Sequence, residues 1–271
     1  MTKKLKDITF GQYFDSKSAI HKADPRIKIV LLVLIIVFIF LAKNFWGLGL
    51  AALFILITML VSKIPVKMYF KNLKAILPIL IFTSIINVFY GEGDVLFSIW
   101  KFEVTTGGLE RAGFMALRIM LLIIASSTLT YATTPNDLTD GIESLLSPLR
   151  FIGLKTAVHT LAMMMTIALR FIPTLVEEAE KIMNAQKARG ADLESGNLKE
   201  KVKALIPILI PLLFSAVRRA AELADAMECR CYNSGEGKTR MKQLKLHFRD
   251  FALTFITLIF GAGVILFNIF M

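Results

Sequence analysis

Two arginines carry the clearest chemical signal in this sequence. Arg189 lies near the end of the run Ala185–Gly190 and Arg230 near the end of the run Ala226–Cys231, and each follows an alanine by four residues, about one helical turn. A guanidinium stays charged at physiological pH and can bind a carboxylate through two parallel hydrogen bonds. The repeated pattern predicts two arginine-tipped helix ends that a partner protein binds.

A structural role would explain the same arginines. Cations at the carboxyl end of a helix interact favourably with the helix dipole, and glycine is the residue that most often follows a helix end. Because the pattern occurs twice and an apolar stripe leads to each copy, we favour docking of a partner. The expected docking residues are Ala188, Arg189, Gly190, Cys229, Arg230 and Cys231.

The sequence shows no pattern of catalytic residues, and we expect neither a cofactor nor a metal ion. The only cysteines, Cys229 and Cys231, are too few for a zinc site, and the three histidines are scattered along the chain. Gly237–Thr239 resembles the end of a P-loop, but Tyr232 occupies the position of its first glycine. We therefore expect a protein that performs no chemistry itself.

Composition indicates an integral membrane protein. Of the 271 residues 55% are hydrophobic, and the mean hydropathy is +0.63, which exceeds that of ordinary soluble domains. The net charge of +11 is typical of a membrane protein with basic cytoplasmic loops. Nucleic-acid binding is disfavoured because aromatic residues do not alternate with the basic ones.

Apolar runs predict five membrane-spanning helices. The runs are Ile29–Ala42, Phe45–Ser62, Ala75–Tyr90, Phe114–Thr134 and Phe251–Met271. Lysines crowd the amino-terminal segment and the connection after the second run, whereas the predicted polar loop Gly91–Glu110 is acidic. The positive-inside rule then places the amino terminus in the cytoplasm and the carboxyl terminus outside.

The segment between the fourth and fifth runs differs in character. Pro135–Leu149 has the spacing of a short amphipathic helix, and the stretch Leu161–Tyr232 holds two long helices that are apolar at the start and amphipathic at the end. In an alternative arrangement, Ala157–Val176 and Ala204–Val217 form a re-entrant or spanning pair. The predicted orientation of the termini is the same in both arrangements because two crossings cancel.

We therefore predict an all-α, polytopic integral membrane protein with a cytoplasmic helical insert. Residues 1–134 would form a membrane domain with four transmembrane helices, 135–249 a cytoplasmic domain with two long helices, and 250–271 a final transmembrane helix. Arg118 and Arg170 lie in apolar runs, where an ionisable residue is often functional. We favour structural roles, with Arg118 reaching a membrane face and Arg170 buried in a pair with a carboxylate.

The amino-terminal segment carries a family signature, consisting of Gly11, Gln12, Tyr13, His21, Asp24, Pro25, Arg26 and Lys28. Together with the two arginine motifs and the order of the spans, this signature resembles the transmembrane T component of energy-coupling factor (ECF) transporters. The coupling-helix motif of that family is usually Ala-Arg-Gly, which Arg189 matches. Arg230 lies in Cys-Arg-Cys, which keeps the arginine and departs from the family pattern at both neighbours.

The resemblance implies a subunit of an ABC-type importer in the cell membrane. Two ATP-binding cassette ATPases would hydrolyse ATP, and a small membrane S subunit would bind a vitamin or a metal ion. The T component would join them in the lipid bilayer through coupling helices that dock in grooves on the ATPases. The alternative is a secondary transporter or another polytopic permease, which the uncharged centres of the spans disfavour. The sequence does not encode the transported substrate.

Overall fold

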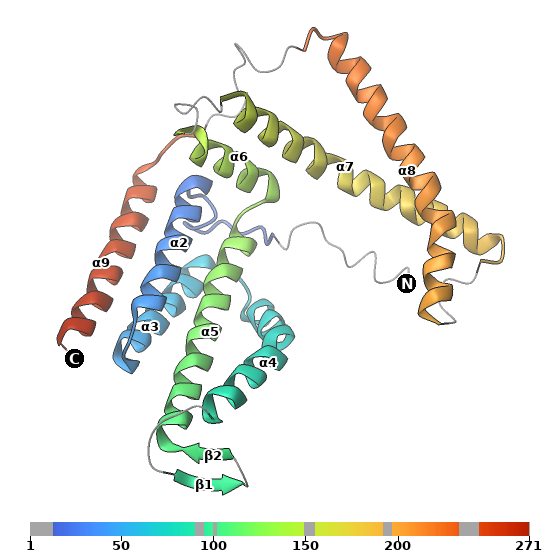
Figure 1. The fold of residues 1–271 in the computed structure, drawn as a ribbon. Helices are drawn as coiled ribbons and strands as arrows, with labels where there is room; N and C mark the ends of the chain where they lie inside the picture. Colours follow the sequence, from blue (N-terminus) through green and yellow to red (C-terminus); the bar gives the residue numbers. More distant parts are fainter. Residues whose placement is uncertain are drawn as a thin grey trace. The chain divides into compact units, whose positions relative to one another are not determined.

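The computed structural model describes residues 13–89, 95–99, 102–148, 155–191, 197–232 and 244–270. These residues are almost entirely helical, which confirms the predicted all-α membrane fold (Figure 1). The elements are α2 (Pro25–Leu41), α3 (Phe45–Ser62), α4 (Val66–Phe89), β1 (Val95–Ile99), β2 (Phe102–Thr105), α5 (Thr106–Ala132), α6 (Pro135–Leu145), α7 (Lys155–Ala188), α8 (Leu198–Glu228) and α9 (Phe248–Phe270).

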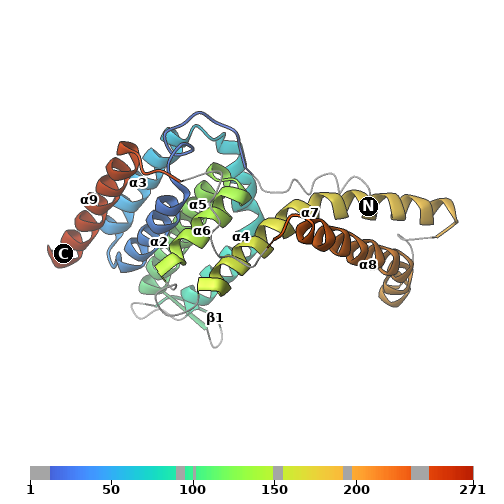
Figure 2. The ribbon, with the colours of Figure 1, turned by 90° about the horizontal axis from the view of Figure 1, so that it is seen from above.

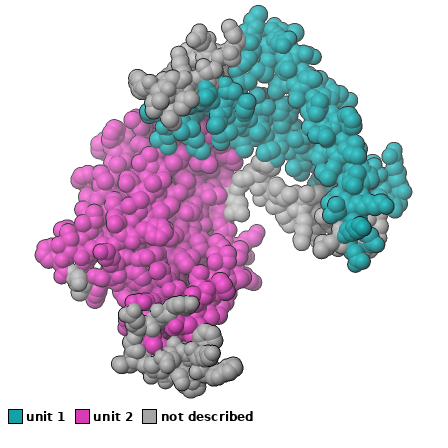
Figure 3. All heavy atoms as spheres, viewed as in Figure 1, with its two compact units in different colours: residues 1–10, 142–242 teal, residues 11–141, 243–271 magenta. Residues whose placement is uncertain are grey.

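The chain forms two compact units, coloured separately in Figure 3. Gly11–Gly141 and Gln243–Met271 make the membrane unit, which contains α2 to α5 and α9. Ile142–Lys242 belongs to the second unit, which contains α7 and α8. The last helix therefore packs with the first helices of the chain, although more than a hundred residues separate α9 from α5 in sequence.

In the membrane unit, α2, α3, α5 and α9 surround one apolar core (Figure 2). Ile39, Leu48 and Val264 are fully buried there, and the rings of Phe54 and Phe260 stack with centroids 4.4 Å apart. Leu121 and Ala125 of α5 complete the core, and the outer faces of these apolar helices stay exposed. A bilayer supplies the apolar surroundings that those outer faces require.

Helix α4 packs along α5 through polar contacts as well as apolar ones. The hydroxyl of Tyr131 donates to the carbonyl oxygen of Met68 at 3.1 Å, and the amide of Asn72 donates to the hydroxyl of Ser127, also at 3.1 Å. At the other end of the pair, a Cβ atom on Gly108 would overlap the carbonyl oxygen of Val88. Glycine is therefore the residue that permits this approach of the two backbones.

Two boundary predictions were wrong. Helix α4 begins at Val66 instead of Ala75, because the exposed lysines of its first turns lie at helical spacing and continue the helix. The segment predicted as the polar loop Gly91–Glu110 contains an antiparallel hairpin of β1 and β2 in its described part, followed directly by α5. The side chain of Thr105 accepts the N–H of Gly108 at 3.1 Å, which fixes the start of α5.

Six of the described helices are long and apolar enough to cross a membrane: α3, α4, α5, α7, α8 and α9. Helix α2 has 17 residues and is also apolar after its first turn. Pro173 lies inside α7, and Pro207 and Pro211 lie inside α8, without ending either helix. Each of the two long helices predicted after residue 135 is thus one continuous rod.

The contact between Gly108 and α4 yields a stability prediction. Gly108→Ala should destabilise the membrane unit by about 1–3 kcal/mol, because the new methyl group meets backbone that cannot swing aside. Gly113→Ala is the matched control on the same helix, since no atom lies within 4 Å of its Cβ position. Thermal unfolding in detergent should show a lower midpoint for Gly108→Ala and an equal or higher midpoint for Gly113→Ala. Equal midpoints for the two variants would contradict the close approach.

Candidate functional site

The carboxyl end of α7 is closed by a hydrogen-bonded turn directly after Arg189. Gly190 has φ +86°, in the left-handed region that favours glycine. The N–H of Gly190 donates to the carbonyl of Lys187 and the N–H of Ala191 to that of Gln186, both at 3.0 Å. This pair of bonds around a left-handed residue defines a Schellman motif.

The carboxyl end of α8 repeats the same motif around Arg230. Cys231 has φ +54°, and its N–H donates to the carbonyl of Glu228 at 2.8 Å. The N–H of Tyr232 donates to the carbonyl of Met227 at 2.9 Å. Arg189 and Arg230 therefore hold equivalent places, each immediately before the left-handed residue, and the departure from Ala-Arg-Gly at the second tip leaves the backbone turn intact.

All six predicted docking residues are exposed. Within the described part of the chain, no hydrogen bond or ion pair engages the guanidinium of Arg189 or Arg230. Both cysteines beside Arg230 are free thiols at the surface. The tips are thus available to a partner.

Helices α7 and α8 pack against each other in opposite directions. Met163, early in α7, accepts a hydrogen bond from the hydroxyl of Tyr232, beyond the end of α8. Met183, late in α7, is buried against Ile208, early in α8. The two arginines consequently lie at opposite ends of the pair, about 40 Å apart at 1.5 Å of rise per residue.

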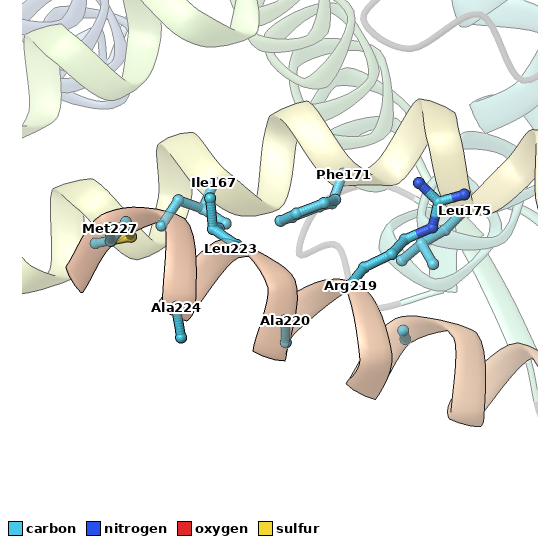
Figure 4. A pocket seen from close by; sticks show the side chains of 9 residues that line it. Ile167, Phe171, Leu175, Arg219, Ala220, Leu223, Ala224 and Met227 are labelled. Atoms are coloured by element: carbon cyan, nitrogen blue, oxygen red, sulfur yellow. The ribbon is translucent and has the colours of Figure 1, made fainter. Parts of the chain in front are cut away.

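The interface between the two helices is mainly apolar and leaves a groove of about 260 Å³. Figure 4 shows Ile167 and Phe171 of α7 on one side of this groove and Leu223 and Met227 of α8 on the other. An ion pair also crosses the interface, with Arg219 Nη2 3.5 Å from Glu178 Oε2. Because the helices are antiparallel, the apolar stripe near the end of each helix packs against the first part of the other. Leu223 and Met227 of α8 face Ile167 and Phe171 of α7, and Met183 of α7 packs on Ile208 of α8.

The described residues of the amino-terminal signature lie together at one end of the membrane unit. In the sequence they are far from both Arg189 and Arg230. The side chain of Lys28 is buried and donates from Nζ to the carbonyl oxygens of His21 at 3.0 Å and Ala132 at 2.9 Å. Because a buried cation needs such acceptors, this contact fixes the start of α2 against the end of α5. Phe14 adds a backbone bond from its N–H to the carbonyl of Tyr131 at 2.9 Å.

Asp24 connects the same junction to α9. Its side chain accepts the N–H of Arg26 at 3.0 Å and so caps α2, where Pro25 holds the first helical position. Its own N–H donates to Oδ1 of the fully buried Asp250 at 2.9 Å. Oδ2 of Asp250 accepts the N–H of His247 at 2.8 Å. One carboxylate thereby joins the start of α2 to the start of α9.

His21 completes the junction as a neutral ring. Burial lowers the pKa of His21, and the positive charge of Lys28 acts in the same direction. Its Nε2 lies 2.8 Å from the carbonyl oxygen of Phe14, which can only accept, so Nε2 carries the proton. Nδ1 then accepts the hydroxyl hydrogen of Ser18 at 2.7 Å. Tyr13 packs edge-on against the ring with centroids 5.9 Å apart.

Comparison with known proteins decides the family. The family model described as a cobalt transport protein, CbiQ, matches residues 16–241. The energy-coupling factor transporter transmembrane protein EcfT of Ruminiclostridium cellulolyticum is 54% identical over 263 residues, which cover 97% of each chain. The EcfT of Clostridium kluyveri is 53% identical over 94% of each chain, and that of Bacillus subtilis is 42% identical over 97% of this chain and 98% of its own.

The chain belongs to the EcfT family. It is therefore a multi-pass protein of the cell membrane and the transmembrane coupling component of an ECF transporter. Membership confirms the resemblance that the signature and the two arginine motifs predicted.

Some contacts in this structure have no local signal in the sequence. Asp250 lies 226 positions after Asp24, and a single acidic residue at the start of an apolar run does not predict a hydrogen bond between the two. Gly11 and Gln12 of the signature lie outside the described residues, as does the P-loop-like run Gly237–Thr239. The junction is built from the other six signature residues together with Asp250.

The two arginines in apolar runs have different surroundings. Arg118 donates to the carbonyl oxygen of Ala42 at the end of α2, and its guanidinium lies 4.6 Å from the ring centroid of Phe114. Arg118 thus connects α5 to α2, in keeping with a structural role. The predicted burial of Arg170 in an ion pair was wrong, because Arg170 is exposed on α7.

The shared turn yields a prediction for the two left-handed residues. Cys231→Gly should stabilise the end of α8 by about 1–2 kcal/mol, because glycine adopts positive φ without the steric cost of a Cβ atom. Gly190→Ala should destabilise the end of α7 by a similar amount, although no atom would touch the new methyl group. Hydrogen exchange of the last turn of each helix measures both effects. Unchanged protection in both variants would contradict the assigned turns.

Proposed function

We propose that the exposed guanidinium groups of Arg189 and Arg230 dock in grooves on two ATPase subunits of the transporter. One observation carries this proposal. Two exposed arginines each lie in a Schellman turn, and the two turns are at opposite ends of an antiparallel helix pair. A separation of about 40 Å gives each arginine room for a partner of its own. A groove that offers a carboxylate would bind each guanidinium through two hydrogen bonds.

A cap on the helix dipole is the competing explanation for both arginines. An exposed charge at a helix end contributes about 0.3–1 kcal/mol, which a lysine supplies as well as an arginine. Docking predicts a larger effect, because truncating one member of a buried, hydrogen-bonded charge pair costs about 2–5 kcal/mol. The size of the effect on assembly therefore separates the two explanations.

In this proposal the chain is a mechanical coupler and not an enzyme. The partner ATPases hydrolyse ATP, and α7 and α8 carry the resulting displacement toward the membrane. A small S subunit binds the transported vitamin or metal ion. Continuous helices of 34 and 31 residues suit this task, because a displacement at one tip moves the whole rod.

The arginine prediction compares three exposed arginines. Arg189→Ala and Arg230→Ala should each lower ATPase binding by at least about thirtyfold, as a loss of about 2 kcal/mol or more requires, and the double variant should be worse than either. Arg218→Ala is the matched control, because Arg218 is exposed on α8 and its ion pair with Glu222 at 3.8 Å lies at the surface. Pull-down of the ATPases and ATP-driven uptake in vesicles measure the effects.

Arg→Lys at either tip should restore binding only in part, because lysine lacks the planar fork of the guanidinium. A double Arg→Ala variant that assembles and transports like the wild type would rule out docking. Full rescue by lysine would instead favour a contribution from charge alone.

We further propose that 1–134 forms the membrane domain, 135–249 a cytoplasmic coupling domain and 250–271 the last transmembrane helix. Helices α2 to α5 and α9 would span the bilayer, with the amino terminus inside and the carboxyl terminus outside. The exposed lysines at the start of α4 support a cytoplasmic location for the connection between α3 and α4. The apolar first halves of α7 and α8 would be covered by the membrane interface or by partner subunits.

Cysteine labelling from outside intact cells tests this topology. In a variant without Cys229 and Cys231, an impermeant thiol reagent should label Glu110→Cys, near the start of α5, and should fail to label Ala188→Cys. Glu110 and Ala188 are both exposed, so access to the reagent depends on the side of the membrane. Labelling of Ala188→Cys without permeabilisation would overturn the proposed orientation.

A further inference from the structure

The carboxyl ends of α7 and α8, here called the two tips, have the same backbone turn but carry side chains of opposite charge. Because both end in the same turn, residues 181–190 of α7 correspond one by one to residues 222–231 of α8. Lys181 then corresponds to Glu222 and Lys187 to Glu228, so the charge reverses at two equivalent positions. Asn184 corresponds to Asp225, which adds a third negative charge on α8.

The acidic residues near the carboxyl end of α8 are unfavourable for the helix dipole. The negative end of the helix dipole lies at the carboxyl terminus, where cations stabilise a helix and anions destabilise it. Helix α7 follows this rule with Lys187 in its last turn, whereas the last turn of α8 holds Glu228 and no basic residue. Residues that violate a local rule often serve a function instead.

Asp225 and Glu228 are exposed, so burial inside this chain does not explain them. Glu222 is exposed as well and has Arg218 3.8 Å away as a surface partner. Charges that surround a docking residue contribute chiefly to the choice of partner and to the rate of encounter. The reversed charges are therefore placed to distinguish between two binding surfaces.

We propose that these charges determine which groove each arginine enters. The tip of α7 fits a groove whose rim is acidic, and the tip of α8 fits a groove that carries a cation beside the acceptor for Arg230. The inference rests on the proposed docking of both arginines in ATPase grooves. It adds Lys181, Lys187, Asp225 and Glu228 as specificity-determining residues.

Exchange of the charges between the tips tests this proposal in the full chain with its ATPase subunits. The α8 variant Glu222→Lys, Asp225→Asn, Glu228→Lys and the α7 variant Lys181→Glu, Asn184→Asp, Lys187→Glu both keep Arg189 and Arg230. Each variant should lower ATPase binding at low salt by about tenfold or more, because like charges then face each other. The deficit should shrink as salt rises toward 1 M and the charges are screened.

The α8 variant separates recognition from folding. It removes anions from a helix carboxyl end and should raise or preserve the thermal midpoint of the chain while it lowers ATPase binding. Wild-type binding by the α8 variant at low salt would overturn the inference, as would a binding deficit that does not respond to salt. The Arg189→Ala, Arg230→Ala variant in the same assay tells the two failures apart. If that variant fails to bind while the exchanged variants bind normally, docking stands and the charge-based selection falls.

Discussion

The antiparallel packing of α7 on α8 is the constraint on which the functional geometry depends. Two parallel helices of similar length would present their carboxyl ends side by side, to a single partner. Antiparallel packing, held by Met183 against Ile208 and by the ion pair of Arg219 with Glu178, places those ends at opposite extremes. The proposed docking on two ATPase subunits requires ends that point apart, and the largely apolar packing of α7 on α8 holds the helices in that arrangement.

The membrane unit uses buried charge in place of apolar packing at one end. Lys28 and Asp250 are buried there, and each binds backbone groups from a distant part of the chain. Buried charges of this kind are costly unless every hydrogen bond is made, so they define one arrangement of α2, α5 and α9. The family signature is thus a set of residues that fixes the start of the helix bundle, whereas the arginine motifs lie at exposed helix ends.

Much of the fold could be predicted from the sequence, because apolar runs and helical spacing are local signals. The predicted run Phe45–Ser62 coincides with α3, and the two coupling helices were expected as continuous rods. The start of α4 differs from the prediction because a cluster of lysines without acidic residues is typical of a connection between spans, although the spacing of these lysines is helical. The β1–β2 hairpin was missed because polar and acidic residues in its segment suggested a loop.

The sequence locates the two arginines of the proposed site but does not show the backbone turn around each. The sequence predicts a helix end at Gly190, because glycine is favoured at that position. The residues Cys-Arg-Cys do not predict that Cys231 adopts the same left-handed conformation. The equivalence of the two tips, and with it the reversal of charge between them, becomes visible only when both turns are seen. The contact of Asp250 with Asp24 likewise depends on the tertiary fold.

Crosslinking from the two tips tests the central claim most directly. Cys229 is a natural exposed thiol beside Arg230, and Ala188→Cys, in a chain whose own cysteines are replaced, puts a thiol in the equivalent place beside Arg189. A short thiol-directed photocrosslinker on either position should attach the chain to an ATPase subunit in the assembled transporter. The same reagent on Arg218→Cys should not. Absence of ATPase adducts from both tips, in a complex that still transports, would contradict the account.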